Sequence, residues 1–511
     1  MTTALMPTDS NIHRRQTIVR NSLFGILAWV APLTVGMVAT PILIRNLGNS
    51  EFGLYSVVLG FLAYSFGFGV AKVVIKFVAE FRANGLDSRI NDVLSAAFWL
   101  SLVIGIAGSS VLILAAPFIV SNILLVPAEQ VESAILAVYF ASAAMIAGQS
   151  GQIFLYALQG LHRFGIILFL TTVNGLMLGL GNIVIALNGY GVVALLAWTF
   201  FSAAISSLLY VIAAKRALPS LTIHFRFSSN SITSVVKYAS SILTYQALAN
   251  SLYIFERVWV VRTFGPEVMA FYAVPMLLAT YMQSFLSSFS ATLFPVMNEL
   301  LNRGEQQIEL YKRGSKIIAA FVSYAVVSSV GLGQVALGLW IDPTFARNSS
   351  KLLIIHTTSF GLMSILIMSW QLNEAYGAAK LNVILTAIWA IVTIPMMILV
   401  ADHWGSEGFA FSRLAGIAVT IPMILYFEKR HFGQALIRFW ISVILRLGLS
   451  GGILMIFYLL VNKFQPSWLG LIGTAVGGLL LYSLTLFPTG FLKRKDLAEA
   501  LSLLPVPRGL K

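Results

Sequence analysis

Apolar stretches long enough to cross a lipid bilayer recur along the whole chain of 511 residues, and this feature constrains the fold more than any other. Hydrophobic residues make up 58% of the sequence and charged residues only 10%, whereas soluble globular proteins carry about 25% charged residues. An unpaired backbone amide in lipid costs several kcal/mol, so each apolar stretch must form a helix. The sequence therefore predicts an all-α, polytopic membrane protein.

About fourteen spanning helices are predicted from the glycine, proline, asparagine and charged residues that interrupt the apolar stretches. Their approximate cores are 21–44, 52–75, 93–116, 133–157, 164–187, 191–213, 234–261, 268–296, 315–338, 352–373, 381–401, 407–427, 439–461 and 468–488. The stretch 116–132, which contains "PFIVSNILLVPAEQ", fits either a loop or a partial re-entry into the membrane.

Lysine and arginine indicate the orientation of these helices. The two tails, the connections that follow even-numbered spans and the span ends beside them contain roughly 25 of the 33 basic residues, and basic residues collect on the cytoplasmic side of membrane proteins. Both termini are therefore predicted to be cytoplasmic. The net charge of +14 follows from this topology and does not indicate a nucleic-acid surface. Because cysteine is absent, disulfides, thiolate metal sites and cysteine nucleophiles are excluded.

The chain contains an internal repeat. "RNLGNSEFGLYSVV" begins at Arg45, and "RTFGPEVMAFYAVP" begins 217 residues later at Arg262. The same offset relates Gly160 to Gly377 and Gly191 to Gly408, and it lays spans one to six over spans seven to twelve.

Six spans return the chain to the side on which it started, so the two copies are predicted to be parallel repeats, as in many transporters. We expect an N-lobe (20–216) and a C-lobe (233–430) around a central cavity, followed by two further helices (431–490). The remaining segments are predicted to be cytoplasmic: the tails 1–20 and 491–511 and the linker 217–232.

Three stretches carry a resemblance to a known family: "TPILIRNLGNSEFGLYSVV", "GFGVAKVVIKFVAE" and "ALQGLHRF". The chain resembles the polysaccharide (O-antigen, Wzx-type) flippases. These belong to the multidrug/oligosaccharidyl-lipid/polysaccharide (MOP) exporter superfamily, together with the MATE drug exporters and the lipid II flippases. One position departs from the family, which often has an Asp–x–Gly late in the second helix where this chain has Gly67 in place of the acid.

The resemblance implies a transporter without enzymatic activity or cofactor, in the bacterial cytoplasmic membrane. Its expected cargo is an undecaprenyl-pyrophosphate-linked oligosaccharide, moved from the cytoplasmic to the outer leaflet by alternating access for O-antigen, exopolysaccharide or capsule synthesis. Expected partners are membrane lipid, a coupling cation (H+ or Na+), and the polymerase and glycosyltransferases of the same pathway.

Three alternatives stay open at this point. A MATE-type cation-coupled drug antiporter would fit twelve spans better than fourteen, and a lipid II flippase would share the fold. A membrane polymerase, ligase or glycosyltransferase would need a substantial outer loop. The richest outer segment, "ADHWGSEG", offers only Asp402, His403 and Glu407 and has no paired-carboxylate or metal-ligand pattern.

The repeat also separates charges that the shared scaffold requires from charges that one half adds. Arg413 lies inside a span where the first half has Leu196, and an ionisable residue inside a span indicates a functional site. Lys72 and Lys76 lie one helical turn apart, where the second half has Phe289 and Leu293. These three residues are the leading candidates for binding pyrophosphate, because Arg and Lys are its natural partners.

Further candidates for the cavity carry a weaker signal. Glu256, Arg257 and Glu374 occur in one half only, although Glu374 could simply pair with Lys380 and the other two could form an interfacial ion cluster. Arg45 and Arg262 occur in both halves and fit interfacial anchors, because arginine heads reach toward the interface. The polar pair Gln152 and Gln371 completes the set.

Overall fold

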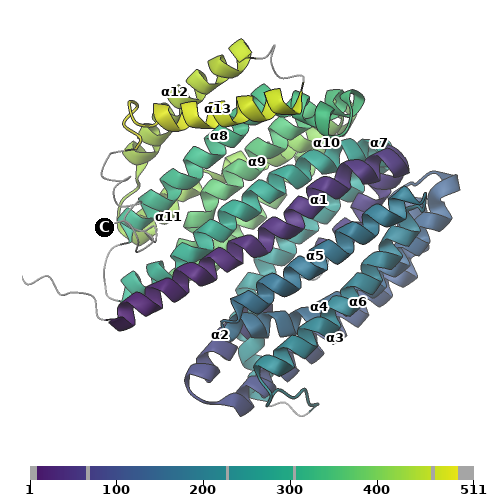
Figure 1. Ribbon diagram of the computed structural model, residues 1–511, viewed down its shortest axis with the longest axis vertical. Helices are drawn as coiled ribbons and strands as arrows, with labels where there is room; N and C mark the ends of the chain where they lie inside the picture. Colours follow the sequence, from purple (N-terminus) through teal and green to yellow (C-terminus); the bar gives the residue numbers. More distant parts are fainter. Residues whose placement is uncertain (1–8, 65–69, 226–228, 303–306, 462–466, 493–511) are drawn as a thin grey trace, which may run out of the picture. The chain divides into compact units, whose positions relative to one another are not determined.

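The structure is a computed structural model that describes residues 9–64, 70–225, 229–302, 307–461 and 467–492. Its described residues form helices and short connections and contain no strand (Figure 1). The helices are α1 (Asp9–Tyr64), α2 (Val70–Ala83), α3 (Asp87–Phe118), α4 (Val131–Gly160), α5 (Phe164–Leu187), α6 (Val192–Ala217), α7 (Ser229–Asn302), α8 (Ile308–Trp340), α9 (Pro343–Ala375), α10 (Lys380–Thr420), α11 (Met423–Phe432), α12 (Ile437–Val461) and α13 (Trp468–Thr485).

Eleven segments of the described residues are long and apolar enough to cross a membrane. Each overlaps one or two of the predicted spans, and Thr244–Ser290 covers the seventh and eighth together. The predicted all-α, polytopic fold is confirmed, whereas the count of fourteen spans stays a prediction.

The helix bounds differ in places from the predicted span cores. α1 begins at Asp9, ahead of the predicted first core, and the second core, 52–75, is described as α1 up to Tyr64 and α2 from Val70. The stretch 116–132 holds the end of α3, one π-helical turn and one 3-10 turn (Ala128–Gln130), and its place as a loop or a partial re-entry stays a prediction. The twelfth core, 407–427, lies within one apolar segment, His403–Phe432, in which α10 and α11 meet at Pro422, a residue with no amide proton to donate to a continuing helix.

The repeat is visible in the backbone itself. Gly48 interrupts α1 with φ 81° and ψ 166°, and Gly265, 217 residues later, interrupts α7 with φ 84° and ψ 169°. Residues with a side chain rarely adopt this conformation, so glycine is needed at both breaks. The two related stretches therefore fold in the same way locally.

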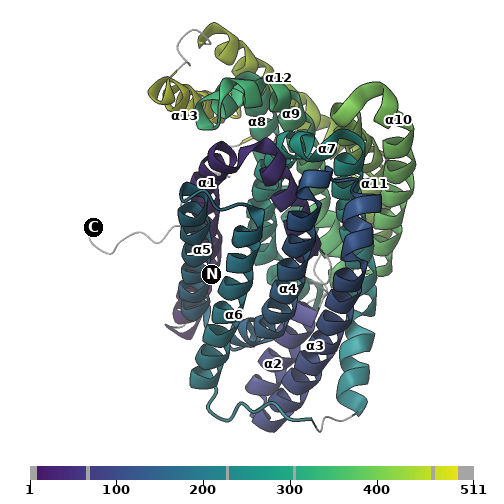
Figure 2. The ribbon, with the colours of Figure 1, turned by 90° about the vertical axis from the view of Figure 1, so that its right-hand side faces the viewer.

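The chain forms two compact units. The first comprises Met1–Ala273 and Ala379–Ser412, and in it α4 packs against α6 and α3 while α1 packs against α5 (Figures 1 and 2). The second comprises Val274–Ala378 and Arg413–Lys511, and in it α8 packs against α9, α12 and α13. These bounds differ from those of the predicted lobes, since α7 and α10 contribute to both units, and the division into lobes stays a prediction.

Small residues bring the backbones of α4 and α6 close together. A methyl group built on Gly151 would overlap the side chain and Cα of Ser207, and the Ser207 hydroxyl donates a hydrogen bond to the Ala147 carbonyl oxygen at 2.6 Å. Helices in lipid associate through such close packing and interhelical hydrogen bonds, because lipid tails are as apolar as the side chains themselves.

We therefore expect Gly151→Ala to destabilise the protein by about 1–3 kcal/mol, as overpacked cores do. The measurement is the thermal unfolding midpoint of the detergent-purified protein. Gly452→Ala in α12 is the matched control, because nothing lies within 4 Å of the added methyl group there. Equal midpoints for the two variants would contradict the close packing of α4 on α6.

Candidate functional site

Arg413 lies in α10 and is fully buried. The central carbon of its guanidinium group is 5.2 Å from the centroid of the Phe360 ring in α9, within the second unit. A cation over an aromatic face gains about 2 kcal/mol where both groups are desolvated. A guanidinium can also donate two parallel hydrogen bonds to a phosphate, so this residue could hold a diphosphate.

The position equivalent to Arg413 in the first half is occupied by Leu196. Leu196 is also fully buried, so the position is an interior one in both halves. Only the second half places a charge there, although an apolar side chain satisfies the packing of the first.

Glu256 and Arg257 lie in α7 within the first unit. Glu256 is fully buried, and the Tyr272 hydroxyl donates a hydrogen bond to its carboxylate. Arg257 is half-buried and donates from Nη1 to the Ser56 carbonyl oxygen at 3.1 Å. The two neighbouring residues therefore make these hydrogen bonds to different groups.

The arginines shared by both halves are exposed. Arg262 donates from Nη1 to the carbonyl oxygens of Asn122 and Ile123, at 2.7 and 3.1 Å, and its guanidinium lies 5.9 Å from the Trp259 ring. Arg45 is exposed on α1. The interfacial interpretation and a role in binding both stay predictions.

Lys72 and Lys76 both lie in α2. Lys76 is exposed, with its ammonium nitrogen 5.3 Å from the centroid of the Phe77 ring. The side chain of Lys72 and the residue Gly67 lie outside the described part of the structure. A cationic mouth formed by the two lysines is therefore still a prediction.

The polar candidates on α4 and α9 lie in different units. Gln152 is exposed and accepts a hydrogen bond from the Tyr156 hydroxyl of its own helix at 2.8 Å. Gln371 and Glu374 are half-buried on α9, and the Gln371 Oε1 atom is buried without a hydrogen-bond partner among the described residues. That these residues line a cavity stays a prediction.

Sequence reasoning missed Glu428, at the start of the "EKRHF" end of α11. Its fully buried carboxylate accepts hydrogen bonds from the Tyr311 hydroxyl (3.0 Å), the Trp440 Nε1 atom (2.7 Å) and the Leu436 amide (2.8 Å). It thereby joins α8, α11 and the start of α12. The only signal in the sequence was a single acid beside Lys429 and Arg430, which is also typical of a solvated helix end.

A second group of polar contacts lies beside Glu428 in the second unit. His431 of α11 is 2.8 Å from the Asn373 side chain, and its ring packs at a tilt against that of Tyr376 with 4.4 Å between centroids. The Tyr376 hydroxyl donates to the Gln307 side chain at 2.9 Å, and burial raises the pKa of this phenol, so it stays a neutral donor. In the part of the chain that the structure describes, no cluster of acids and histidines could hold a metal ion.

Removing the Glu428 carboxylate leaves three buried donors without their acceptor, each of which costs about 1–3 kcal/mol. We expect Glu428→Ala to lower the stability of the detergent-purified protein by about 3 kcal/mol or more, measured as a lower thermal unfolding midpoint. The control is Glu309→Ala, because Glu309 pairs with Arg313 at the surface, where such pairs are worth about 0–1 kcal/mol. Similar midpoints in both variants would contradict a structural role of Glu428.

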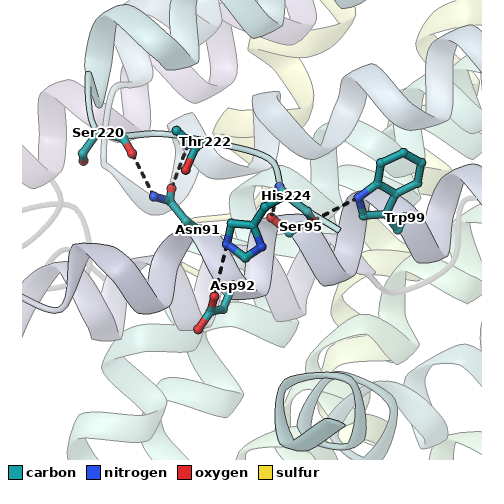
Figure 3. Close-up of polar contacts among 7 residues, drawn as sticks. All are labelled: Asn91, Asp92, Ser95, Trp99, Ser220, Thr222 and His224. Carbon is teal, nitrogen blue, oxygen red and sulfur yellow. Dashed lines mark hydrogen bonds and ion pairs between the residues drawn. The ribbon is translucent and has the colours of Figure 1, made fainter. Parts of the chain in front are cut away.

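The predicted linker after α6 is attached to α3 along residues 218–225 (Figure 3). The Asn91 amide donates to the Ser220 carbonyl oxygen at 2.8 Å and accepts from the Thr222 amide at 3.2 Å. The Ser95 hydroxyl accepts from the His224 amide at 3.1 Å. We call residues 218–225 the anchored segment.

The spacing of the two elements explains this attachment. Asn91, Ser95 and Trp99 lie four residues apart, or about 6 Å along a helix. Two residues of an extended chain cover a similar length, about 6.7 Å. Every second amide of the anchored segment therefore lies opposite the next side chain of this series on α3. Trp99 completes the series by donating to the His224 carbonyl oxygen at 3.2 Å, and the His224 ring lies 3.3 Å from the Asp92 carboxylate (Figure 3).

Asn91→Ala should release the anchored segment, because two hydrogen bonds worth about 1 kcal/mol each disappear together. We expect the amides of Thr222 and His224 to exchange their hydrogens about tenfold faster, as measured by mass spectrometry. Asn84→Ala is the control, because the Asn84 side chain bonds the Glu80 carbonyl of the helix that it follows. Unchanged exchange in Asn91→Ala would show that the segment is held by other contacts.

Comparison with known proteins shows which protein family and which solved structures the chain is similar to. A family model described as "polysaccharide biosynthesis protein" matches residues 18–301. A Shigella flexneri protein, proposed by its name to be an O-antigen transporter, is 18% identical over 400 residues, which cover 78% of this chain and 94% of that protein.

Two solved structures share the fold. The lipid II flippase MurJ, in an inward closed conformation, superposes with a TM-score of 0.68 at 12% identity, covering 91% of this chain and 97% of MurJ. An inward-facing MATE-family multidrug transporter of the MOP superfamily superposes with a TM-score of 0.62 at 14% identity, covering 81% of this chain and 94% of the transporter. The all-helical architecture is therefore the fold of these two solved transporters.

Proposed function

Because the chain belongs to the polysaccharide biosynthesis protein family, we propose that it is a flippase for lipid-linked oligosaccharides. Its substrate would be an undecaprenyl-pyrophosphate-linked repeat unit, transferred from the cytoplasmic to the outer leaflet by alternating access. The related O-antigen transporter and the fold shared with a lipid II flippase support this proposal.

The observation that carries the proposal is the buried guanidinium of Arg413 over the Phe360 ring. An arginine inside an apolar helix is costly, and such residues face the interior of the protein and mark substrate pathways. A pyrophosphate is the part of the substrate that most needs a cation, because its charge cannot enter hydrocarbon alone. The polyprenyl tail can stay in the bilayer throughout.

We assign the remaining candidates by their positions in the predicted topology. Lys72 and Lys76 would form a cationic entrance on the cytoplasmic side, and Arg413 would bind the pyrophosphate. The expected coupling cation is H+ or Na+, and the polymerase and glycosyltransferases of the same pathway are the expected partners.

The proposal is tested in vesicles that contain the purified protein and a fluorescent undecaprenyl-pyrophosphate oligosaccharide, whose leaflet is read by chemical quenching from outside. We expect Arg413→Ala to slow transfer by about tenfold to a hundredfold, since a hydrogen bond to a charged group is worth about 1.5–3 kcal/mol. Arg413→Lys should recover part of the rate, because the charge remains while the two-pronged donor is lost.

Arg313→Ala is the control, because its partner Glu309 lies at the surface and the pair contributes little. Full transfer by Arg413→Ala at normal protein abundance would contradict the assignment. Uptake of an organic cation by the parent protein, without transfer of the lipid probe, would favour a drug antiporter instead.

A further inference from the structure

Two cations from different helices meet at the end of α13 in the second unit. The chain leaves α13 through residues 486–492, which we call the terminal turn. Lys316 of α8 donates from Nζ to the Phe491 carbonyl oxygen at 2.6 Å, and Arg446 of α12 donates from Nη1 to the Gly490 carbonyl oxygen. Both cationic side chains are half-buried. Two positive groups are therefore held on consecutive carbonyls of one turn.

The packing around the terminal turn fixes the position of this pair. α12 and α13 pack against each other and against α8 (Figure 1). The Tyr482 hydroxyl of α13 donates to the Ala320 carbonyl oxygen of α8 at 3.0 Å. In the opposite direction, the Tyr324 hydroxyl of α8 donates to the Ala475 carbonyl oxygen of α13 at 3.0 Å. Ala320 lies one helical turn after Lys316, so the pair is preorganised, which lowers the entropy cost of binding a ligand.

The helices that surround the pair contain almost no negative charge. α12 and α13 have no acidic residue, and the one acid of α8, Glu309, pairs with Arg313. The sequence continues after the terminal turn with three further basic residues, at positions 493–495. A backbone carbonyl carries only a partial charge, so two carbonyls do not balance two full positive charges. The end of α13 therefore favours the binding of an anion.

Apolar side chains next to the two cations are exposed. Ile317, which follows Lys316, is 51% exposed. Leu445, which precedes Arg446, is 63% exposed. Both residues lie on helices that are long and apolar enough to cross a membrane, so they are suited to contact with acyl chains. A phosphate beside the cations and acyl chains along the helices are the two parts of a phospholipid.

We propose that Lys316 and Arg446 bind the phosphate of an anionic phospholipid, such as phosphatidylglycerol, at the end of α13. Basic groups between membrane helices on the cytoplasmic side suit such headgroups, and the predicted topology places the terminal turn on that side. A free phosphate ion would meet the same cations but would gain nothing from the exposed apolar residues, which is why we assign the site to a lipid. The inference does not depend on the proposed substrate, because neither residue belongs to the proposed pyrophosphate site.

The test uses the detergent-purified full chain, titrated with phosphatidylglycerol or with zwitterionic phosphatidylcholine, and native mass spectrometry measures the lipid that stays bound. We expect phosphatidylglycerol to bind about tenfold more tightly than phosphatidylcholine. Lys316→Gln and Arg446→Gln should each weaken binding of phosphatidylglycerol about fivefold, which corresponds to about 1 kcal/mol per cation. Binding of phosphatidylcholine should not change.

Arg163→Gln and Lys215→Gln are the matched controls, because each removes one exposed cation of the first unit. Arg446→Lys should keep most of the binding, since lysine also binds phosphate as a point charge. The thermal unfolding midpoint separates lipid binding from a purely structural cap. Loss of a cap lowers the midpoint equally in both lipids, whereas loss of a lipid site removes the extra stability that phosphatidylglycerol gives.

Equal affinity of the parent protein for the two lipids would overturn the inference. Equal weakening in the site variants and the controls would also overturn it, because the attraction would then come from the overall charge. If Arg446→Gln fails to accumulate, the comparison of Lys316→Gln with Lys215→Gln decides the result. Displacement of phosphatidylglycerol by an equal concentration of inorganic phosphate would assign the site to a free ion instead.

Discussion

A polar group inside the membrane must find its hydrogen-bond partner within the protein, and the rest of this structure depends on that requirement. The backbone meets it by forming helices along nearly all of the described residues. Side-chain hydroxyls such as Ser142 and Ser359 meet it by bonding the carbonyl four residues earlier in the same helix. Charged side chains cannot be satisfied so locally, and they therefore decide where helices must meet.

Glu428 and Arg413 show two ways of placing a charge in the interior. The Glu428 carboxylate accepts from Tyr311 of α8 and from Leu436 and Trp440 at the start of α12, so it links α11 to both of these helices. Arg413 instead places its cation over the Phe360 ring, which stabilises the positive charge.

The repeat makes the differences between the halves informative. Tyr55 and Tyr272 are equivalent and both buried, yet Tyr55 accepts a hydrogen bond from Asn182 and Tyr272 donates one to Glu256. The second half has Leu399 where the first has Asn182, and the first half has Ala39 where the second has Glu256. The scaffold thus keeps the tyrosine and the nearby glycine break, while each half supplies its own polar partner.

The sequence by itself determined the helical membrane fold, the repeat and its glycine breaks, and the positions at which one half adds a charge. These are local properties, because bilayer thickness sets the length of an apolar stretch and backbone sterics set where glycine is required. Only the tertiary structure decided that Glu428 joins three segments, that Arg262 reaches the end of α3, and that Gly53 touches Pro266. Helices that are apolar on all sides have no amphipathic face to show which side meets a neighbour. Their rotation, and with it the partner of each polar side chain, is set by packing between helices distant in the sequence.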